Sequence, residues 1–414
     1  MEMTRRNCLA VLGALPATGT LAAAAAPAIA VEPRAALPDK ASFAPTDLTY
    51  LDSGTTHPVP LKTRAAMDAY VAARAAPGIG GTSVESERIL GNFARLINAE
   101  PDEVAFVQST TTAEHMIVDA LGLFHSNADV VTDTLHFFGS FPLYEGLARQ
   151  GAQVTWLRPH DGRIRLEEMA AAITERTRLV ALSLVSTYNG FEHDLREVCR
   201  LAHAKGALVY ADIVHAAGCV PIDVKASGVD YAACASYKWL MGDFGLGFVF
   251  ASRQAQQRLQ RKRFGYYGVA TFESHVYPFD PPGETVADFT MQPNATGHFA
   301  TGTYSHATAA GLDQSLQYIL GLGVDRINAH ARTLTDRLKA ELPRLGYQLV
   351  TPVESPAPIV TCLLENARSL APRFEEAKVR ITLSRNRFRI TPSVFNDIDD
   401  IERLLRVLGR GPAA

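Results

Sequence analysis

The sequence predicts an α/β protein: a mostly parallel β-sheet covered by helices on both faces, followed by a smaller C-terminal α+β domain. Short apolar runs alternate with segments of helical spacing between residues 104 and 251. Uninterrupted apolar runs are typical of strands that are buried on both faces of a sheet. After residue 306 the order changes to a long helical stretch and then short strands. The 414 residues carry a net charge of −3 and no long basic run, which argues against a nucleic-acid partner.

The large domain, placed at 49–305, begins with helical segments and a glycine-rich loop at 77–82. Apolar periodicity predicts helices at 61–76, 84–98, 113–123, 139–150, 166–173 and 195–205. The expected strands are 104–107, 129–132, 153–156, 179–185, 207–210, 229–235 and 247–251.

The small domain, placed at 306–414, starts with a helical stretch at 306–341 that is interrupted near Gly321 and Gly323. A cleft between two such domains is a usual place for a ligand. Before it, residues 264–279 are crowded with aromatic side chains, which could line a pocket, cover an oligomer interface or pack a long loop. Short strands are expected at 348–350, 359–364, 379–383 and 388–390, with helices at 367–377 and 397–408.

The first thirty residues have the features of a signal peptide. The pair Arg5-Arg6 precedes an uncharged, alanine-rich stretch, and Ala28-Ile29-Ala30 is a small-x-small cleavage site. The arginine pair fits the twin-arginine type, which predicts a periplasmic or secreted protein starting at Val31. An uncleaved anchor helix and a cytoplasmic protein are the alternatives. Residues 31–48 are expected to run extended over the surface.

Four cysteines remain after the signal peptide, and their spacing shows no CxxC or zinc pattern. No metal site is therefore expected. Cys219 and Cys234 could pair in an oxidising compartment, but both lie in apolar surroundings, which favours buried free thiols. The other two are Cys199 and Cys362.

Lys238 is the residue around which a catalytic site is predicted. It follows the apolar run 229–235 and precedes the run 247–251, with glycines between. A lysine in an apolar wall loses hydration, so its amine becomes a usable nucleophile of the kind that forms a Schiff base. The plain alternative is a lysine that snorkels out of a strand end.

Three other groups stand beside expected strand ends, where parallel sheets bind ligands. The turn 109–112 is rich in hydroxyls and precedes a helix, which suits a phosphate or an ordinary helix cap. Asp212 ends a buried strand and requires a cationic partner, such as a pyridinium nitrogen, or it caps a helix; His215 follows it. Arg389 suits a substrate carboxylate, or else a surface ion pair.

The order of these motifs resembles the class V aminotransferase superfamily of fold-type I pyridoxal-phosphate enzymes. The motifs are the Thr-rich turn, Asp-x-x-His-x-x-Gly at 212–218, Ser-Tyr-Lys at 236–238, Gly-Thr at 302–303 and a C-terminal arginine. The resemblance covers about residues 50–408. It is greatest to the isopenicillin N epimerase-like and cysteine desulfurase-like branch, with a kynureninase-like Ser-Tyr-Lys. It implies a seven-stranded, mostly parallel sheet and a homodimer.

The resemblance also implies a role for each matched residue around pyridoxal 5′-phosphate. Lys238 forms the Schiff base, Asp212 pairs with the ring nitrogen and His215 lies near the phenolic oxygen. The phosphate is expected on Thr111, Thr112, Ser236 and Tyr237, and on Thr303 of the neighbouring subunit. Phe137 is expected to stack on the ring, with His136 or Phe138 as alternatives, and Thr187 stands where relatives often carry Asn. Arg389 is expected to bind the substrate carboxylate.

One departure from the family pattern concerns sulfur chemistry. Cysteine desulfurases of this superfamily use a loop cysteine shortly before the carboxylate-binding arginine, whereas residues 363–414 contain none. Cys362 falls in an apolar strand pattern, where a thiol is inert. We therefore expect no persulfide-forming desulfurase activity.

The expected substrate is a small amino acid or amine. The reaction is transamination, epimerisation, elimination or oxidation, within an enzyme that could tailor an exported metabolite or peptide. A protein that binds the cofactor without turnover is the alternative from another class.

Overall fold

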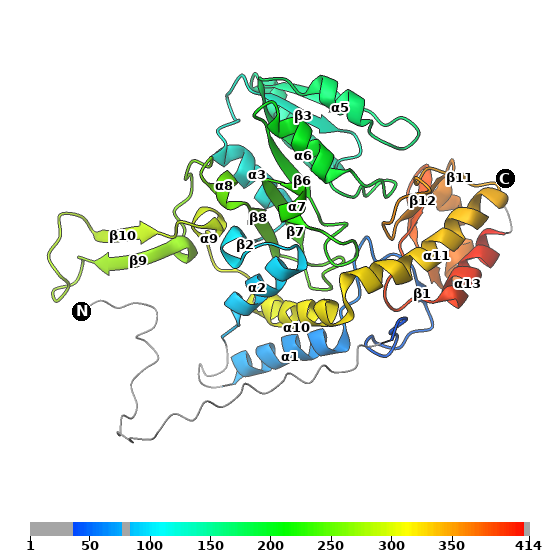
Figure 1. Ribbon diagram of the computed structural model, residues 1–414. Coiled ribbons are helices and arrows are strands. Elements are labelled where there is room, and N and C mark those ends of the chain that lie inside the picture. Colours follow the sequence, from blue (N-terminus) through cyan, green and yellow to red (C-terminus); the bar gives the residue numbers. More distant parts are fainter. Residues whose placement is uncertain (1–35, 77–82, 410–414) are drawn as a thin grey trace, which may run out of the picture.

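The computed structural model describes residues 36–76 and 83–409. The predicted signal peptide and the glycine-rich loop 77–82 lie outside these residues, as does the start of the segment 31–48. Within the described part of the chain, no helix is long and apolar enough to cross a membrane. Three hydrophobic clusters organise the fold, two on the faces of a large sheet and one in a smaller C-terminal unit (Figure 1).

The large sheet has seven strands in the order β2-β8-β7-β6-β5-β3-β4. β8 pairs antiparallel with both β2 and β7, and the other neighbours pair in parallel. This confirms the predicted α/β class and the mostly parallel sheet. The strands are β2 (Val104–Val107), β3 (Asp129–Asp133), β4 (Gln153–Leu157), β5 (Thr177–Ser183), β6 (Leu208–Asp212), β7 (Tyr231–Ala235) and β8 (Gly247–Ala251).

Alternating side chains of these strands divide between two cores, as the pleat requires. In β6, Val209 and Ala211 pack on the face covered by α2 (Ser86–Leu96), α5 (Leu166–Ala172), α6 (Leu195–His203) and α10 (His306–Leu322). Tyr210 packs on the opposite face, with α3 (Thr110–Ala120), α4 (Phe141–Arg149) and α9 (Ala295–Phe299). Strands buried on both faces explain the uninterrupted apolar runs in the sequence.

Gly323 separates two long helices, α10 and α11 (Val324–Arg344), and has φ +84°. α10, which the sequence-based boundary assigns to the small domain, packs on α1 (Leu61–Ala75) and contributes Leu312 and Leu316 to the large core. α11 instead contributes Leu334 and Leu338 to the small core. The two units therefore meet at this glycine.

The small unit is a four-stranded antiparallel sheet in the order β11-β12-β15-β14, backed by α11 and α13 (Ile398–Leu408). The N-terminal strand β1 (Thr49–Tyr50) pairs in parallel with β13 (Val379–Arg380), so the start of the described chain is attached to this unit. Its remaining elements are β11 (Gln348–Leu349), β12 (Val360–Leu363), α12 (Ala371–Glu376), β14 (Thr382–Leu383) and β15 (Arg387–Ile390).

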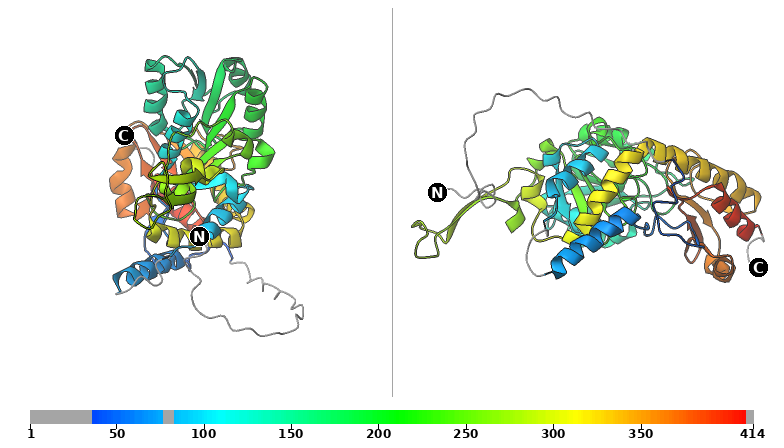
Figure 2. Two further views of the ribbon diagram at one scale, coloured as in Figure 1. Left: turned by 90° about the vertical axis from the view of Figure 1, so that its left-hand side faces the viewer. Right: turned by 90° about the horizontal axis from the view of Figure 1, so that it is seen from below.

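A two-stranded arm of β9 (Val269–Ser274) and β10 (Ala287–Met291) projects from the large domain, on the side away from the small unit (Figure 2). Its aromatic side chains are exposed, including Phe272 and Phe289, which are cross-strand partners. Of the three interpretations of the aromatic stretch, packing inside a long loop is therefore wrong. The short elements that complete the chain are η2 (Pro101–Glu103), η3 (Phe138–Ser140), α7 (Val224–Ser227), α8 (Arg253–Gln256), η4 (Tyr266–Gly268) and η5 (Ala367–Leu370).

Candidate active site

The predicted catalytic side chains gather at the carboxyl ends of β5, β6 and β7. Ser183 ends β5 and is the register partner of Asp212, which ends β6. Lys238 follows β7, the next strand across. Residues at or just after the carboxyl ends of three neighbouring parallel strands therefore lie at one edge of the sheet, where open α/β sheets bind ligands.

The amine of Lys238 lies in a wall of apolar and aromatic groups. The residue is 7% exposed, and Nζ lies 5.9 Å from the ring centre of Phe137 and 5.7 Å from that of Tyr237. Burial lowers the pKa of Lys238 to about 8, although Asp212 opposes this. The side chain does not snorkel to solvent, and with this pKa about a tenth of the amine is neutral at pH 7, far more than for an ordinary lysine.

His215 holds this amine. Lys238 Nζ lies 3.0 Å from His215 Nε2, and the Trp239 indole N–H donates to His215 Nδ1 at 3.4 Å. Burial lowers the pKa of His215 well below its ordinary value, with the charges of Lys238 and Arg389 adding to the effect. Because the indole nitrogen can only donate, the neutral ring carries its proton on Nε2, from which it can donate to the unprotonated form of the lysine amine.

Asp212 is a buried carboxylate that lacks a full set of partners. It is 2% exposed, and Oδ1 accepts from the Val214 backbone N–H at 2.9 Å. Burial raises its pKa to about 6, while His136, the Val214 N–H and Lys238 act in the opposite direction. A cation placed against this carboxylate would be strongly stabilised in so dry a setting. The alternative role, capping a helix, does not apply, because the residues after it form a turn.

Phe137 is the member of the aromatic trio that faces the lysine. Phe138 is 58% exposed, and His136 is fully buried and bonded to Glu114 and Ser183. The ring of Phe137 is therefore the one that can cover a flat ligand beside Lys238. The sequence-based choice of Phe137 over its neighbours agrees with this arrangement.

The Thr-rich turn leads into helix α3 and supplies the residue that caps the N-terminus of that helix. Ser109 is the N-cap and accepts from the Thr112 backbone N–H at 3.1 Å. The backbone donors that remain at this helix N-terminus, with the hydroxyls of Thr111 and Thr112, suit an anion. The capping interpretation is confirmed for Ser109, whose hydroxyl also lies 2.9 Å from that of Thr112, and the phosphate role of the turn stays a prediction.

Ser236 and Tyr237 lie in different surroundings. Ser236 is fully buried and its hydroxyl is directed at two loop carbonyls, those of Asp243 at 2.6 Å and Leu246 at 2.7 Å. Tyr237 is half-buried and stacks on Phe244, with ring centres 4.3 Å apart. In this arrangement Ser236 holds the loop that follows Lys238.

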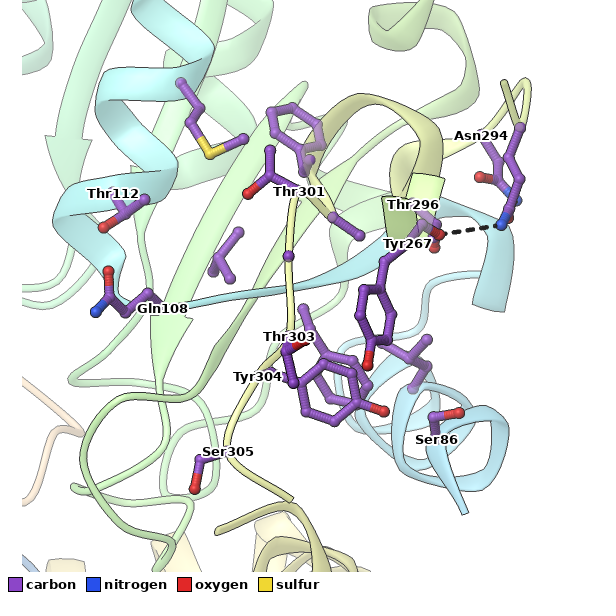
Figure 3. Close-up of a pocket in the computed structure, with 18 of the residues that line it drawn as sticks. Ser86, Gln108, Thr112, Tyr267, Asn294, Thr296, Thr301, Thr303, Tyr304 and Ser305 are labelled. Carbon is purple, nitrogen blue, oxygen red and sulfur yellow. Dashed lines mark hydrogen bonds between the residues drawn. The ribbon is translucent and has the colours of Figure 1, made fainter. Parts of the chain in front are cut away.

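A cavity of about 1040 Å³ opens beside the Thr-rich turn (Figure 3). Thr112 and Gln108 line it from one side, and Thr303 lines it from the loop before α10. Lys238 is not among its lining residues, so this cavity adjoins the expected phosphate end and is not the catalytic pocket itself. Thr303 is exposed here, and Tyr267 of the aromatic stretch also lines the cavity.

Arg389 is a buried guanidinium that links the two units. Nη1 donates to the Thr187 hydroxyl at 2.6 Å, and Nη2 donates to the Thr55 hydroxyl at 2.7 Å and to the Thr382 hydroxyl at 3.2 Å. Thr55 and Thr382 in turn donate to Asp52, whose Oδ1 lies 3.9 Å from Nη2. Arg389 is thus not a surface ion pair.

The Nε atom of Arg389 is buried and has no hydrogen-bond partner among the described residues. A buried N–H without an acceptor is costly, so this donor indicates a missing acceptor. A carboxylate is the group that pairs best with a guanidinium.

Sequence reasoning missed the side chains that support these groups. Asp52, Thr55 and Thr382 belong to segments far apart in the chain, and nothing in their local pattern relates them to Arg389. Glu114 carried a signal that could have been used: it is a carboxylate beside the apolar positions Ala113 and Ile117 of a buried helix.

The fold and the buried amine of Lys238 at the edge of an α/β sheet are those expected of an enzyme that forms a Schiff base through a lysine. Comparison with known proteins identifies the class. The profile of the family Aminotransferase class-V matches residues 49–371. The chain belongs to this family.

The similar proteins include a probable cysteine desulfurase of Methanothermobacter thermautotrophicus, 29% identical over 305 residues, which covers 71% of this chain and 72% of that protein. The cysteine desulfurase of Thermococcus onnurineus NA1 superposes with a TM-score of 0.74 at 22% identity, covering 88% of this chain and 94% of that one. A mutant of C-DES with glycine covalently linked to its PLP cofactor gives a TM-score of 0.79 at 18% identity, covering 90% and 99%. Other relatives are named kynureninase and uncharacterized aminotransferase.

These relatives correct the expectation that cysteine desulfurase activity is excluded. Several of the matching curated proteins and solved structures are named cysteine desulfurases, so the exclusion is wrong as a statement about this type of enzyme. Cys362 is indeed buried, and burial raises its pKa to about 12. The error was to exclude the activity from the surroundings of one thiol, because cleavage of a C–S bond by elimination needs no enzyme thiol.

The cofactor is pyridoxal 5′-phosphate, and the described residues fit it. Lys238 supplies the amine, Asp212 an under-paired carboxylate for the ring nitrogen, Phe137 an aromatic face and the turn at Thr111 and Thr112 an anion site. When bound, this cofactor withdraws electrons from the bonds of the carbon that carries the amino group. The individual residue roles stay predictions.

Proposed function

We propose that this protein acts on a small amino acid with a free α-carboxylate, and that its reaction is cleavage of a carbon–sulfur bond in a cysteine-type substrate. The orphaned Nε of Arg389 is the observation that carries the substrate class. The names of the relatives support the choice of sulfur chemistry. Transamination or epimerisation is the second candidate, because a relative of comparable identity is named an aminotransferase.

The chain's own groups supply the required steps. Arg389 binds the carboxylate and thereby orients the substrate's amino end toward Lys238. Lys238, partly neutral and held by His215, takes or returns a proton at the substrate's α-carbon as general base and acid. Phe137 and Tyr237 keep water from one side of the reacting atoms.

The test is a substrate screen on purified protein reconstituted with pyridoxal phosphate, using cysteine, cystine, alanine and kynurenine. The cofactor absorbance and the products are followed. Elimination from cysteine consumes water and gives sulfide, pyruvate and ammonia, whereas transfer of its sulfur to an acceptor thiol leaves alanine and a persulfide. Alanine racemisation or pyridoxamine phosphate would instead favour the second candidate.

Two variants make the screen decisive. Lys238→Ala should abolish turnover and the lysine-bound absorbance. Arg389→Lys should raise KM by about tenfold or more, because a guanidinium paired with a carboxylate is worth about 1.5–3 kcal/mol. Arg387→Lys, on the same strand with its guanidinium over the Tyr188 ring, is the matched control. A cofactor spectrum that no amino acid alters would overturn the proposal.

We also propose export, on the strength of Arg5-Arg6 and the Ala28-Ile29-Ala30 site alone. The protein would then act outside the cytoplasm, on a metabolite or peptide precursor. Sequencing the N-terminus of protein recovered from the periplasm or medium should give Val31; an intact N-terminus in a cytoplasmic fraction would contradict export.

A further inference from the structure

A buried polar cluster lies directly behind the site, on the α3 and α4 face of the sheet. It joins Glu114 of α3, His136 and Ser140 of the loop after β3, Tyr144 of α4 and Ser183 of β5. Each of these residues is at most 5% exposed. Burying a carboxylate among apolar side chains costs several kcal/mol unless it is paired, so this cluster requires a reason.

Both carboxylate oxygens of Glu114 have hydrogen-bond partners among the neighbouring side chains. Oε1 accepts from the Tyr144 hydroxyl at 2.7 Å and lies 3.0 Å from His136 Nε2, while Oε2 accepts from the Ser140 hydroxyl at 2.5 Å. Burial alone would raise the pKa of Glu114, but His136 and the hydroxyls outweigh burial and lower it. Burial would lower the pKa of His136, but Glu114, with Asp212 and Asp133, raises it. Both shifts favour the ionised form of the pair.

The other side of His136 leads to the catalytic groups. Nδ1 lies 2.9 Å from the Ser183 hydroxyl oxygen, to which a charged imidazole donates, and that oxygen also accepts from the Phe137 backbone N–H at 3.2 Å. Ser183 is the register partner of Asp212 on the next strand. His136 thus fixes Phe137, whose ring faces Lys238. The same histidine lies close to the carboxylate of Asp212 at the end of β6.

We propose that Glu114 and His136 are positioning residues for the cofactor: Glu114 keeps His136 charged, and His136 both anchors Phe137 through Ser183 and keeps the Asp212 carboxylate ionised. The inference rests on the cofactor's ring nitrogen facing Asp212. It does not depend on which amino acid is the substrate. A different result in the substrate screen would therefore leave it standing.

The groups around Asp212 determine whether its pKa rises or falls when Glu114 and His136 are neutralised. His136 and Lys238 favour its charged form, Glu114 disfavours it, and Tyr144 and Tyr210 are neutral neighbours. His215 is also neutral, since its pKa is depressed. The influence of His136 on Asp212 exceeds that of Glu114, so neutralising the pair raises the pKa of Asp212. The ring nitrogen then loses its anionic partner at a higher pH.

The experiment measures the affinity of cofactor-free protein for pyridoxal phosphate as a function of pH, by absorbance, in wild type, Glu114→Gln and Tyr144→Phe. Tyr144→Phe removes a hydrogen bond to the same Oε1 without removing a charge, so it reports the effect of packing alone. We expect wild type to lose affinity as the pH falls through about 6. Glu114→Gln should lose affinity about one pH unit higher than wild type, which is a weakening of about fivefold at pH 6. Tyr144→Phe should follow wild type.

A wild-type measurement keeps the proposal testable if Glu114→Gln does not fold. NMR of cofactor-free protein with labelled histidine should show a buried histidine that stays charged at pH 7, next to the neutral His215. A neutral His136 at that pH would overturn the proposal, as would equal pH profiles for the three proteins.

Discussion

Lys238 and Asp212 are buried together, yet burial moves the pKa of each toward neutrality from opposite sides. The pKa of the amine falls to about 8 and that of the carboxyl rises to about 6. Between these values the amine is partly neutral while the acid is largely ionised. A narrow interval of pH therefore gives both groups the charge states that the proposed chemistry requires.

The pKa of Lys238 predicts how cofactor capture depends on pH. Because the amine attacks only when neutral, the rate at which cofactor-free protein takes up pyridoxal phosphate should rise with pH and level off above about 8. Stopped-flow absorbance measures this rate. A rate that still rises toward the ordinary lysine value of 10.5 would show that the amine is solvated.

Single residues could be predicted from the sequence where a short motif fixes their place. Asp212 and Lys238 directly follow apolar strands, so adjacent parallel strands bring them together. Glu114 and Asp52 could not be predicted, because their partners lie on other elements and are met only after folding. The prediction that desulfurase activity is absent was wrong for a related reason. It was drawn from the local sequence around Cys362, whereas the predicted catalytic groups lie elsewhere in the chain.

At the scale of elements, apolar patterning recovered every strand of the large sheet to within a few residues. Helix α3 was placed late, at 113–123 in place of Thr110–Ala120, because Ser109 and not Thr112 is the cap. Patterning did not disclose that β8 runs antiparallel to both its neighbours, since a doubly buried strand has the same composition in either direction.

Gly321 and Gly323 give a matched pair for testing the junction of α10 and α11. Gly323 has φ +84° and ψ 126°, a conformation essentially confined to glycine, so Gly323→Ala should destabilise the protein by about 1–3 kcal/mol. Gly321 is helical, with nothing within 4 Å of a built Cβ, so Gly321→Ala should stabilise by about 0.5–1 kcal/mol. Urea unfolding would measure both; equal effects would contradict the assignment of strain to Gly323.

At the scale of the whole molecule, the sequence predicted two units but not how they share elements. α10 extends the large core, while β1 and Asp52 attach the start of the described chain to the small unit. Such exchanges depend on contacts between residues hundreds of positions apart. Periodicity within a window of residues carries no information about them.

The proposed dimer can be tested by mixing subunits. If Thr303 completes the neighbour's phosphate site, a Lys238→Ala subunit paired with a Thr303→Ala subunit contains one intact site. Random reassociation of the two variants should then restore about a quarter of wild-type activity, from two preparations that are each impaired. No recovery after verified subunit exchange would place Thr303 in the site of its own chain, whose cavity it lines.

If Arg389 binds the substrate carboxylate as proposed, its position between the units ties affinity for the substrate to their relative orientation. Its guanidinium contacts Thr187 of the large domain and Thr382 of the small one. A rotation about Gly323 that opens the molecule would therefore pull the carboxylate anchor apart while Lys238, Asp212 and the Thr-rich turn, all on the large sheet, stay together. With the proposed roles, such a motion would release a product while pyridoxal 5′-phosphate stays bound to the large domain.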